Sequence, residues 1–211
     1  MTDLSLEQKL LLRLPHPAPR PALFLDRDGV LIEDRHHLSD PAQVAICPGV
    51  ENLLALAHQH NFAVVVVTNQ SGIARGFFDW DAYERVTDRL LALLGPNAPI
   101  AAIYVNGHGP DAPSSSWRKP SPAMLQAAAA DLNLDLSRSL LIGDRLTDLQ
   151  AGARAGLPFL WHVLTGHGVN ERPAVEQWRM KKTSEASGIQ VNFLKSLREF
   201  PCHLLKTLHD E

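Results

Sequence analysis

Two aspartates, Asp26 and Asp28, stand one residue apart at the end of a short apolar run and are followed directly by a glycine. Such a run is typical of a buried strand in a parallel sheet, and open α/β sheets bind ligands beyond the carboxyl ends of their strands. Two carboxylates crowded at one strand end repel each other unless a cation lies between them, most simply a metal ion. Asp-x-Asp-Gly also occurs in ordinary turns, but the acids downstream lack the spacing of a calcium-binding loop. A metal-dependent site therefore requires matching groups at other strand ends.

Polar groups also follow later apolar runs of the chain. The β-branched run at residues 62–67 ends in hydroxyls, amides and two glycines at residues 68–76. This stretch predicts either an oxyanion cradle or an ordinary polar turn. Arg118 and Lys119 precede a predicted helix; an isolated pair of this kind is more often solvated, although it can also face an anionic ligand.

A further acid, Asp144, repeats the first pattern, because it ends an apolar run and precedes a segment of small residues. Apolar runs that alternate with segments of helical periodicity predict a parallel sheet with helices on both faces. The expected fold is α/β, a Rossmann-like three-layer α/β/α sandwich with a mainly parallel central sheet. The polar strand ends would then share one edge of that sheet. We expect strands at 22–25, 62–67, 100–105, 139–142 and 157–164, and helices from 48 to about 60, from Asp79 or Asp81 to about 94, and from 122 to about 132.

The remaining segments predict the domain organisation. Residues 1–20 contain a leucine-rich patch and three prolines, which predict a short helical or irregular arm and a stiff linker before one domain at residues 21–211. Residues 31–47 form a long polar loop, and we expect a flap or a substrate-contacting loop there. Residues 169–187 are polar with little periodicity, whereas residues 189–205 predict one short strand and one helix.

The composition of the 211-residue chain, with 45% hydrophobic and 20% charged residues, is ordinary for a soluble globular protein. A net charge of −3 indicates no affinity for nucleic acid or anionic membranes, and no apolar segment approaches the roughly 20 residues that span a bilayer. The N-terminus shows no secretory signal, and Cys47 and Cys202 fit no metal-binding or redox spacing. We expect a cytoplasmic monomer with reduced thiols and without a nucleic-acid or membrane partner.

Carboxylates that hold Mg²⁺ opposite hydroxyl and cationic donors suit phosphoryl transfer. Asp26 and Asp144 are the natural ligands of such an ion. An aspartate can also attack phosphorus and form an aspartyl-phosphate, if a metal offsets the repulsion and donors such as Thr68 and Lys119 hold the phosphoryl oxygens. A second acid must protonate the leaving group and then activate water, and Asp28 lies close enough in sequence to do so.

This ordered set resembles the four motifs of the haloacid dehalogenase superfamily of phosphohydrolases, which also implies that fold with a minimal cap. The resemblance covers residues 22 to about 166. It implies that Asp26 is the nucleophile and Asp28 the general acid/base, and that Asp148 supports the metal ligands without touching the ion. The implied catalytic residues are Asp26, Asp28, Thr68 and Lys119. The implied Mg²⁺ ligands are the carboxylates of Asp26 and Asp144 and the backbone carbonyl of Asp28.

Residues 65–76 and the strings Arg118-Lys119-Pro120 and Thr165-Gly166 are similar to one branch of that superfamily, the heptose bisphosphate and histidinol-phosphate phosphatases. This likeness implies substrate contacts from Asp34, Arg35, His36, His37, Asn69, Gln70, Ser71, Arg118 and Arg145. The branch commonly has lysine where this chain has Arg145, so the charge is kept while reach and hydrogen-bonding geometry differ.

Many members of the branch hold a structural zinc with Cys-x-His and Cys-x-Cys in the loop before Arg-Lys-Pro. Here the corresponding places read Asn106-Gly107-His108 and Ser115-Ser116-Trp117. Only His108 of the four ligands is present, so we expect Mg²⁺ and no zinc. His108 is then a relic or a polar group on the substrate side.

The expected function is a Mg²⁺-dependent phosphomonoesterase for a small phosphorylated sugar, above all a heptose 1,7-bisphosphate. The first alternative keeps the chemistry and changes the substrate to histidinol phosphate or another small phosphoester. A non-catalytic binding domain is disfavoured, because Asp26, Asp28 and Lys119 are all present. Phosphoryl transfer to an acceptor other than water stays open, since Asp28 could activate a sugar hydroxyl.

Overall fold

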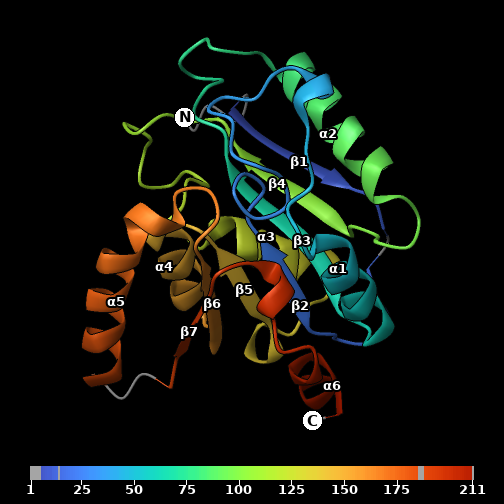
Figure 1. Ribbon diagram of the computed structural model, residues 1–211, viewed down its shortest axis with the longest axis vertical. Coiled ribbons are helices and arrows are strands. Elements are labelled where there is room, and N and C mark those ends of the chain that lie inside the picture. Colours follow the sequence, from blue (N-terminus) through green and yellow to red (C-terminus); the bar gives the residue numbers. More distant parts are fainter. Residues whose placement is uncertain (1–5, 14, 185–187, 211) are drawn as a thin grey trace.

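The computed structural model describes residues 6–13, 15–184 and 188–210. Its centre is a seven-stranded sheet in the order β1-β4-β3-β2-β5-β6-β7, parallel except for the pairing of β1 with β4 (Figure 1). The strands are β1 (Glu7–Leu11), β2 (Ala22–Leu25), β3 (Ala63–Asn69), β4 (Ala102–Asn106), β5 (Leu140–Gly143), β6 (Phe159–Val163) and β7 (Gln190–Leu194). The helices are α1 (Val50–Gln59), α2 (Trp80–Leu94), α3 (Ala123–Leu132), α4 (Leu146–Ala155), α5 (Gly168–Ser184) and α6 (His203–Asp210).

Helices cover both faces of the sheet, as the predicted three-layer α/β/α fold requires. Successive side chains of a strand point to opposite faces, so Leu23 and Leu25 belong to one core and Phe24 to the other. The first core packs against α1, α2 and α6, and the second against α3, α4 and α5. Burial on both faces explains why the central strands read as continuous apolar runs. None of the helices in the described part of the chain is long and apolar enough to cross a membrane.

The strand order decides where the candidate site lies. From β2 the chain proceeds through β3 to β4 on one side, and then returns to place β5, β6 and β7 on the other side. The direction of winding therefore reverses between β2 and β5, and ligands of open α/β sheets bind at such a switch point. The carboxyl ends of β2, β3 and β5, which carry Asp26, Thr68 and Asp144, are consequently neighbours.

Three segments differ from the sequence-based expectation. The helical or irregular arm is wrong for residues 7–11, which form the edge strand β1, because pairing with the free edge of β4 outweighs the weak apolar pattern. Residues 168–184 form α5, whose apolar contacts come mainly from buried Val175 and partly buried Trp178, too few for a visible period. The helix expected around residues 193–200 begins only at His203, after a 3₁₀ turn at Leu197–Glu199. The polar segment expected at 169–187 includes residues 185–187, which lie outside the described residues.

Candidate active site

A cavity of about 440 Å³ opens at the carboxyl ends of the central strands. The sequence-predicted residues that line it are Asp26, Asp28, Asp34, His36, His37, Asn69, Gln70, Ser71, Arg118, Lys119, Arg145 and Asp148. The structure therefore brings together segments that are far apart in the chain. Thr68 and Asp144 lie buried behind this lining, and Arg35 points elsewhere, forming an ion pair with Glu33 at 2.9 Å. The predicted contact of Arg35 with substrate stays a prediction.

Three buried carboxylates form the floor of the site. Oxygen atoms of Asp26, Asp144 and Asp148 lie within 4.8 Å of one another, and the three residues are at most 7% exposed. Lys119 Nζ lies 3.0 Å from Asp26 Oδ1 and 2.7 Å from Asp148 Oδ1, and it donates a hydrogen bond to the carbonyl of Val67. One lysine thus pairs with two of the three acids, so the carboxylates of the cluster outnumber its ammonium group.

The surroundings of Asp144 fit a divalent cation. Its Oδ2 accepts a hydrogen bond from the backbone N–H of His167 at 2.7 Å, whereas its buried Oδ1 has no hydrogen-bond partner. Gly29 and Gly166 both have positive φ angles, and a Cβ on either would collide with this carboxyl group. A buried acceptor without a donor, beside two other carboxylates, has the oxygen ligand chemistry that Mg²⁺ prefers.

Burial and mutual repulsion perturb the titration of the cluster. Burial, and then repulsion by Asp148 and Asp26, raises the pKa of Asp144 to about 8. Burial also raises the pKa of Asp26 to about 6, although Lys119 opposes the shift. For Lys119, burial favours the neutral amine, but the attraction of Asp148 and Asp26 outweighs it and raises the pKa. The lysine is therefore held in its charged form.

Removal of Mg²⁺ is expected to lower the stability of the protein most at high pH. The pKa values of Asp144 (about 8) and Asp26 (about 6) in the folded protein lie above the ordinary value of 3.8. The unfolded chain therefore binds fewer protons than the folded protein in this window, and the contribution of both groups to stability falls as the pH rises through 6 and towards 8. Mg²⁺ binds the charged carboxylates and offsets this loss.

Denaturant unfolding with chelator or with saturating Mg²⁺ measures this effect at several pH values. We expect the difference in unfolding free energy between the two conditions to widen as the pH rises. Asp144→Asn is the control: it removes one of the carboxylates, so the difference in unfolding free energy should widen less with pH in this variant. A difference that stays constant with pH would contradict the assignment of a cation to these carboxylates.

Arg27, which the sequence interpretation missed, holds the second aspartate of the motif. Its buried guanidinium contacts both carboxylate oxygens of Asp28 at 3.0–3.2 Å and lies 4.9 Å from the ring centroid of Tyr83. Gln70 donates a second hydrogen bond to Asp28 at 2.7 Å and donates another to the hydroxyl of Thr68. This network fixes the carboxylate of Asp28 at the cavity wall. The hydroxyl of Thr68 is turned to Gln70 rather than to the cavity.

Basic side chains also line the cavity, namely Arg118 and Arg145. Arg118 donates to the carbonyl of His108 at 3.0 Å, and its pKa is lowered by burial and by repulsion from Arg145. Two arginines that repel each other across a cavity are a suitable receptor for an anionic group. Asn69 exchanges two hydrogen bonds with the backbone of Lys119, so the amide of β3 positions the lysine.

The loop that lacks the zinc ligands is held by the edge strand β1 instead. Glu7 accepts a hydrogen bond from the backbone N–H of Trp117 at 2.7 Å, and its carboxylate lies 3.7 Å from Nε2 of His108. His108 is buried and does not line the cavity, so the structure gives no support to a substrate-side role.

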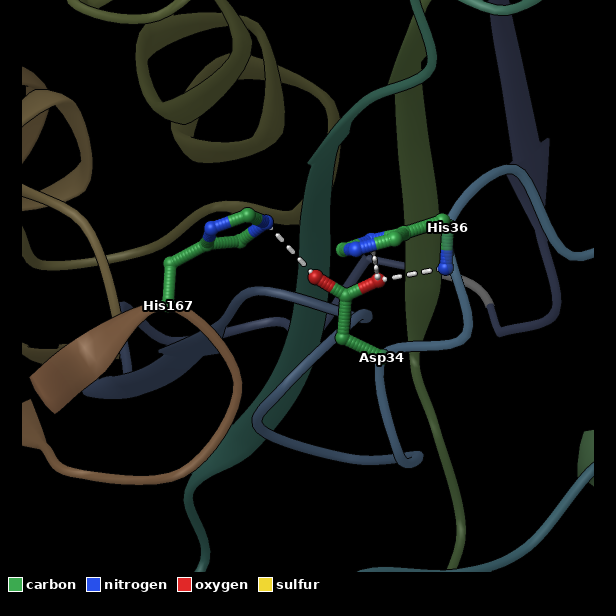
Figure 2. Close-up of side chains that lie close together, drawn as sticks. All are labelled: Asp34, His36 and His167. Carbon is green, nitrogen blue, oxygen red and sulfur yellow. Dashed lines mark hydrogen bonds and ion pairs between the residues drawn. The ribbon is translucent and has the colours of Figure 1, made fainter. Parts of the chain in front are cut away.

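Further residues of the lining were not predicted as site residues, namely Arg75, Thr147, His167 and Glu171. His167 follows β6, and its Nε2 lies 2.7 Å from Asp34 Oδ2 (Figure 2). Its position after an apolar run, next to Gly166, is the same signal that identified Asp26 and Asp144.

The chain is similar to one protein-family model, to named relatives and to solved structures. The HAD-hydrolase-like family model matches residues 116–187. The D-glycero-beta-D-manno-heptose-1,7-bisphosphate 7-phosphatase of Mesorhizobium japonicum is 47% identical over 154 residues, which are 70% of this chain and 71% of that protein. The D-glycero-alpha-D-manno-heptose-1,7-bisphosphate 7-phosphatase of Burkholderia mallei is 38% identical over 64% of this chain and 76% of its own length.

Solved structures agree with these relatives. A HAD-like phosphatase from Mesorhizobium loti superposes with a TM-score of 0.79 at 35% identity and covers 98% of this chain and 94% of its own. The D,D-heptose 1,7-bisphosphate phosphatase of Bordetella bronchiseptica, complexed with magnesium and phosphate, gives a TM-score of 0.70 at 31% identity and covers 90% of this chain and 99% of its own.

Proposed function

This chain belongs to the haloacid dehalogenase-like hydrolase family, and we propose that it is a Mg²⁺-dependent phosphatase that hydrolyses D-glycero-D-manno-heptose 1,7-bisphosphate. One observation carries the chemistry: Lys119 lies between Asp26 and Asp148 beside Asp144, which still has an unbonded oxygen. The substrate is inferred from relatives at 47% and 38% identity that are named as phosphatases of this sugar.

The reaction divides into two steps that use different carboxylates. Asp26 attacks phosphorus with a carboxylate oxygen; the bond from phosphorus to the sugar oxygen breaks, and Asp28 delivers the proton that the leaving oxygen needs. Asp28 then takes a proton from water, which attacks the aspartyl-phosphate. Inorganic phosphate leaves and the carboxylate of Asp26 is restored. Arg27 and Gln70 keep Asp28 in place for both proton transfers.

The carboxylates of Asp26 and Asp144, with the backbone carbonyl of Asp28, would hold Mg²⁺. When bound, the ion supplies positive charge that offsets the repulsion between the carboxylate and the phosphoryl group. Lys119 supplies fixed positive charge beside Asp26, and Asp148 keeps Lys119 in its charged form. Thr68 acts through Gln70, which donates a hydrogen bond to the Thr68 hydroxyl oxygen and another to Asp28.

The cavity is lined by the cations Lys119, Arg118 and Arg145, and it therefore suits a substrate with two anionic ends. One phosphate reacts at Asp26, and the other end needs cations at the rim, which Arg118 and Arg145 provide. Histidinol phosphate is the second candidate substrate, and it carries one phosphate and an amine. Arg118 and Arg145 repel an amine and attract a second phosphate, so these two side chains favour the bisphosphate.

Phosphate release from a panel of phosphorylated sugars and histidinol phosphate, with and without Mg²⁺, tests the proposal. We expect the highest kcat/KM with the heptose 1,7-bisphosphate and dependence on Mg²⁺ with every substrate. A higher kcat/KM with histidinol phosphate would refute the heptose 1,7-bisphosphate as the preferred substrate. Activity that is unchanged by chelator would overturn the chemistry. Product analysis in the presence of polyols distinguishes hydrolysis from transfer to another acceptor.

Arg145→Ala is expected to raise KM for the bisphosphate about 10- to 100-fold with a smaller change in kcat, because a lost hydrogen bond to a charged group costs about 1.5–3 kcal/mol. A sugar monophosphate lacks the second anion and should be affected much less. Arg89→Ala is the matched control, since Arg89 is exposed on α2 and does not line the cavity. Equal losses for the bisphosphate and the monophosphate would remove Arg145 from recognition of the second phosphate.

The domain extent, location and partners of the protein are also proposed here. We propose that the catalytic domain spans residues 21–211, with β1 added to it as an edge strand. A cytoplasmic location agrees with Cys47 and Cys202 as free thiols. A monomer without nucleic-acid or membrane partners agrees with the net charge of −3, and the lack of a structural zinc in the loop before Arg118 agrees with the three missing ligands there.

A further inference from the structure

A second group of metal-ligand side chains lies at the rim of the same cavity, apart from the buried carboxylates. Asp34, His36 and His167 each offer one ligand atom, and these atoms lie within 4.8 Å of one another. Figure 2 shows the two imidazole rings facing the carboxylate of Asp34 from two sides. His167 Nε2 is 2.7 Å from Asp34 Oδ2, and His36 Nδ1 is 3.6 Å from Asp34 Oδ1.

The loop that carries His167 is anchored to the buried part of the site, and the loop that carries Asp34 and His36 is held by an internal hydrogen bond. The backbone N–H of His167 donates to Asp144 at 2.7 Å, and the hydroxyl of the nearby Thr165 donates to the carbonyl of Gly29. His36 adopts a φ angle of 49°, and its backbone N–H donates to Asp34 Oδ1 at 2.9 Å. The ligand atoms therefore converge from two loops without any rearrangement of the strands.

The donor set selects a class of ion. Two imidazoles and one carboxylate suit Zn²⁺, Co²⁺ or Ni²⁺, whereas Mg²⁺ prefers oxygen ligands and would occupy the buried carboxylates. Ligand atoms about 2.0–2.1 Å from a tetrahedral ion lie roughly 3.3 Å apart. The two rings approach different oxygens of Asp34, at 2.7 and 3.6 Å, and one ligand atom from each of the three residues lies within 4.8 Å of the others. The side chain of His36 is 83% exposed, so its ring can rotate to adjust.

We propose that Asp34, His36 and His167 bind a divalent transition-metal ion at the rim of the cavity. Three protein ligands leave at least one coordination position open to water or to an oxygen of a bound ligand. In this cavity, the open position would take a hydroxyl or phosphate oxygen from the end of the substrate that does not react. Only this contact with substrate rests on the proposed function; the binding of the ion does not.

Titration with Co²⁺ in saturating Mg²⁺, followed by visible absorbance and calorimetry, tests the proposal on the full chain. Mg²⁺ keeps the buried carboxylates occupied, so the signal reports the second site. We expect one Co²⁺ per chain. His36→Gln and His167→Gln should each weaken Co²⁺ binding at least about tenfold, because mutation of a residue that only supports a metal ligand already lowers metal affinity about 10–100-fold. His37→Gln is the matched control, since its ring lies against Phe77 with centroids 4.6 Å apart.

Two outcomes with the histidine variants would overturn the site. One is unchanged Co²⁺ affinity in His167→Gln, and the other is an equal loss in His37→Gln and His36→Gln, which would indicate binding by exposed histidines in general. Asp26→Asn is expected to retain the rim site even without phosphatase activity, provided that circular dichroism shows an intact fold. Loss of Co²⁺ binding in this folded variant would also refute an independent rim site, whatever the outcome of the phosphatase assay.

Discussion

Asp26→Asn is expected to abolish turnover while the protein stays folded. An amide cannot form the aspartyl-phosphate, and removal of a catalytic nucleophile costs at least on the order of 10³-fold in kcat. The fold should tolerate the change, because burial already raises the pKa of Asp26 to about 6 and the amide removes a charge that Asp148 and Asp28 repel. Lys119 keeps its ion pair with Asp148 at 2.7 Å.

Steady-state phosphate release in saturating Mg²⁺ measures kcat, and denaturant unfolding measures stability. Asp88→Asn on the exposed side of α2 controls for the loss of one carboxylate anywhere in the protein. Substantial Mg²⁺-dependent activity in Asp26→Asn would refute the nucleophile assignment. Rapid quenching of the wild-type enzyme with labelled substrate should show phosphate bound to protein, and the variant should show none.

Lys119→Met is expected to lower kcat about 10²–10³-fold, because removal of a preorganised charge from a buried site costs about 2.7–4 kcal/mol of transition-state stabilisation. Methionine keeps most of the side-chain volume, so packing changes little. Breaking a buried ion pair can cost about 3–5 kcal/mol of stability. We expect a smaller loss here, because Asp26 can take up a proton and Mg²⁺ can offset the remaining charge.

The double variant Lys119→Met/Asp148→Asn separates the two roles of the lysine. The second substitution removes the buried carboxylate that Lys119→Met leaves without a partner, so the stability lost in the single variant should be largely recovered. Activity should not be recovered, because the positive charge beside the phosphoryl group is still missing. Recovery of both would make Lys119 a purely structural residue, and an unchanged kcat in Lys119→Met would remove it from the site.

The apolar runs alone predicted most of the sheet. Strands that are buried on both faces must be continuous hydrophobic segments, and the run at 62–67 accordingly became β3 (Ala63–Asn69). Edge and surface elements carry weaker patterns. β1 is held by backbone pairing with β4, and α5 by a narrow apolar stripe, and neither pattern stands out in a single sequence.

The pattern of apolar runs and polar strand ends already predicted that Asp26, Asp144 and the segments at Thr68 and Lys119 would meet. Each follows a predicted strand, and parallel strands place their carboxyl ends at one edge of the sheet. Chain order cannot show how side chains then pair. Arg27 folds back onto Asp28, Lys119 bridges Asp26 and Asp148, and His167 reaches Asp34 across a separation of more than a hundred positions. These pairings depend on the paths of the loops and on which polar groups are buried together. Both follow from the packing of segments that are distant in the chain, so they become visible only in the folded protein.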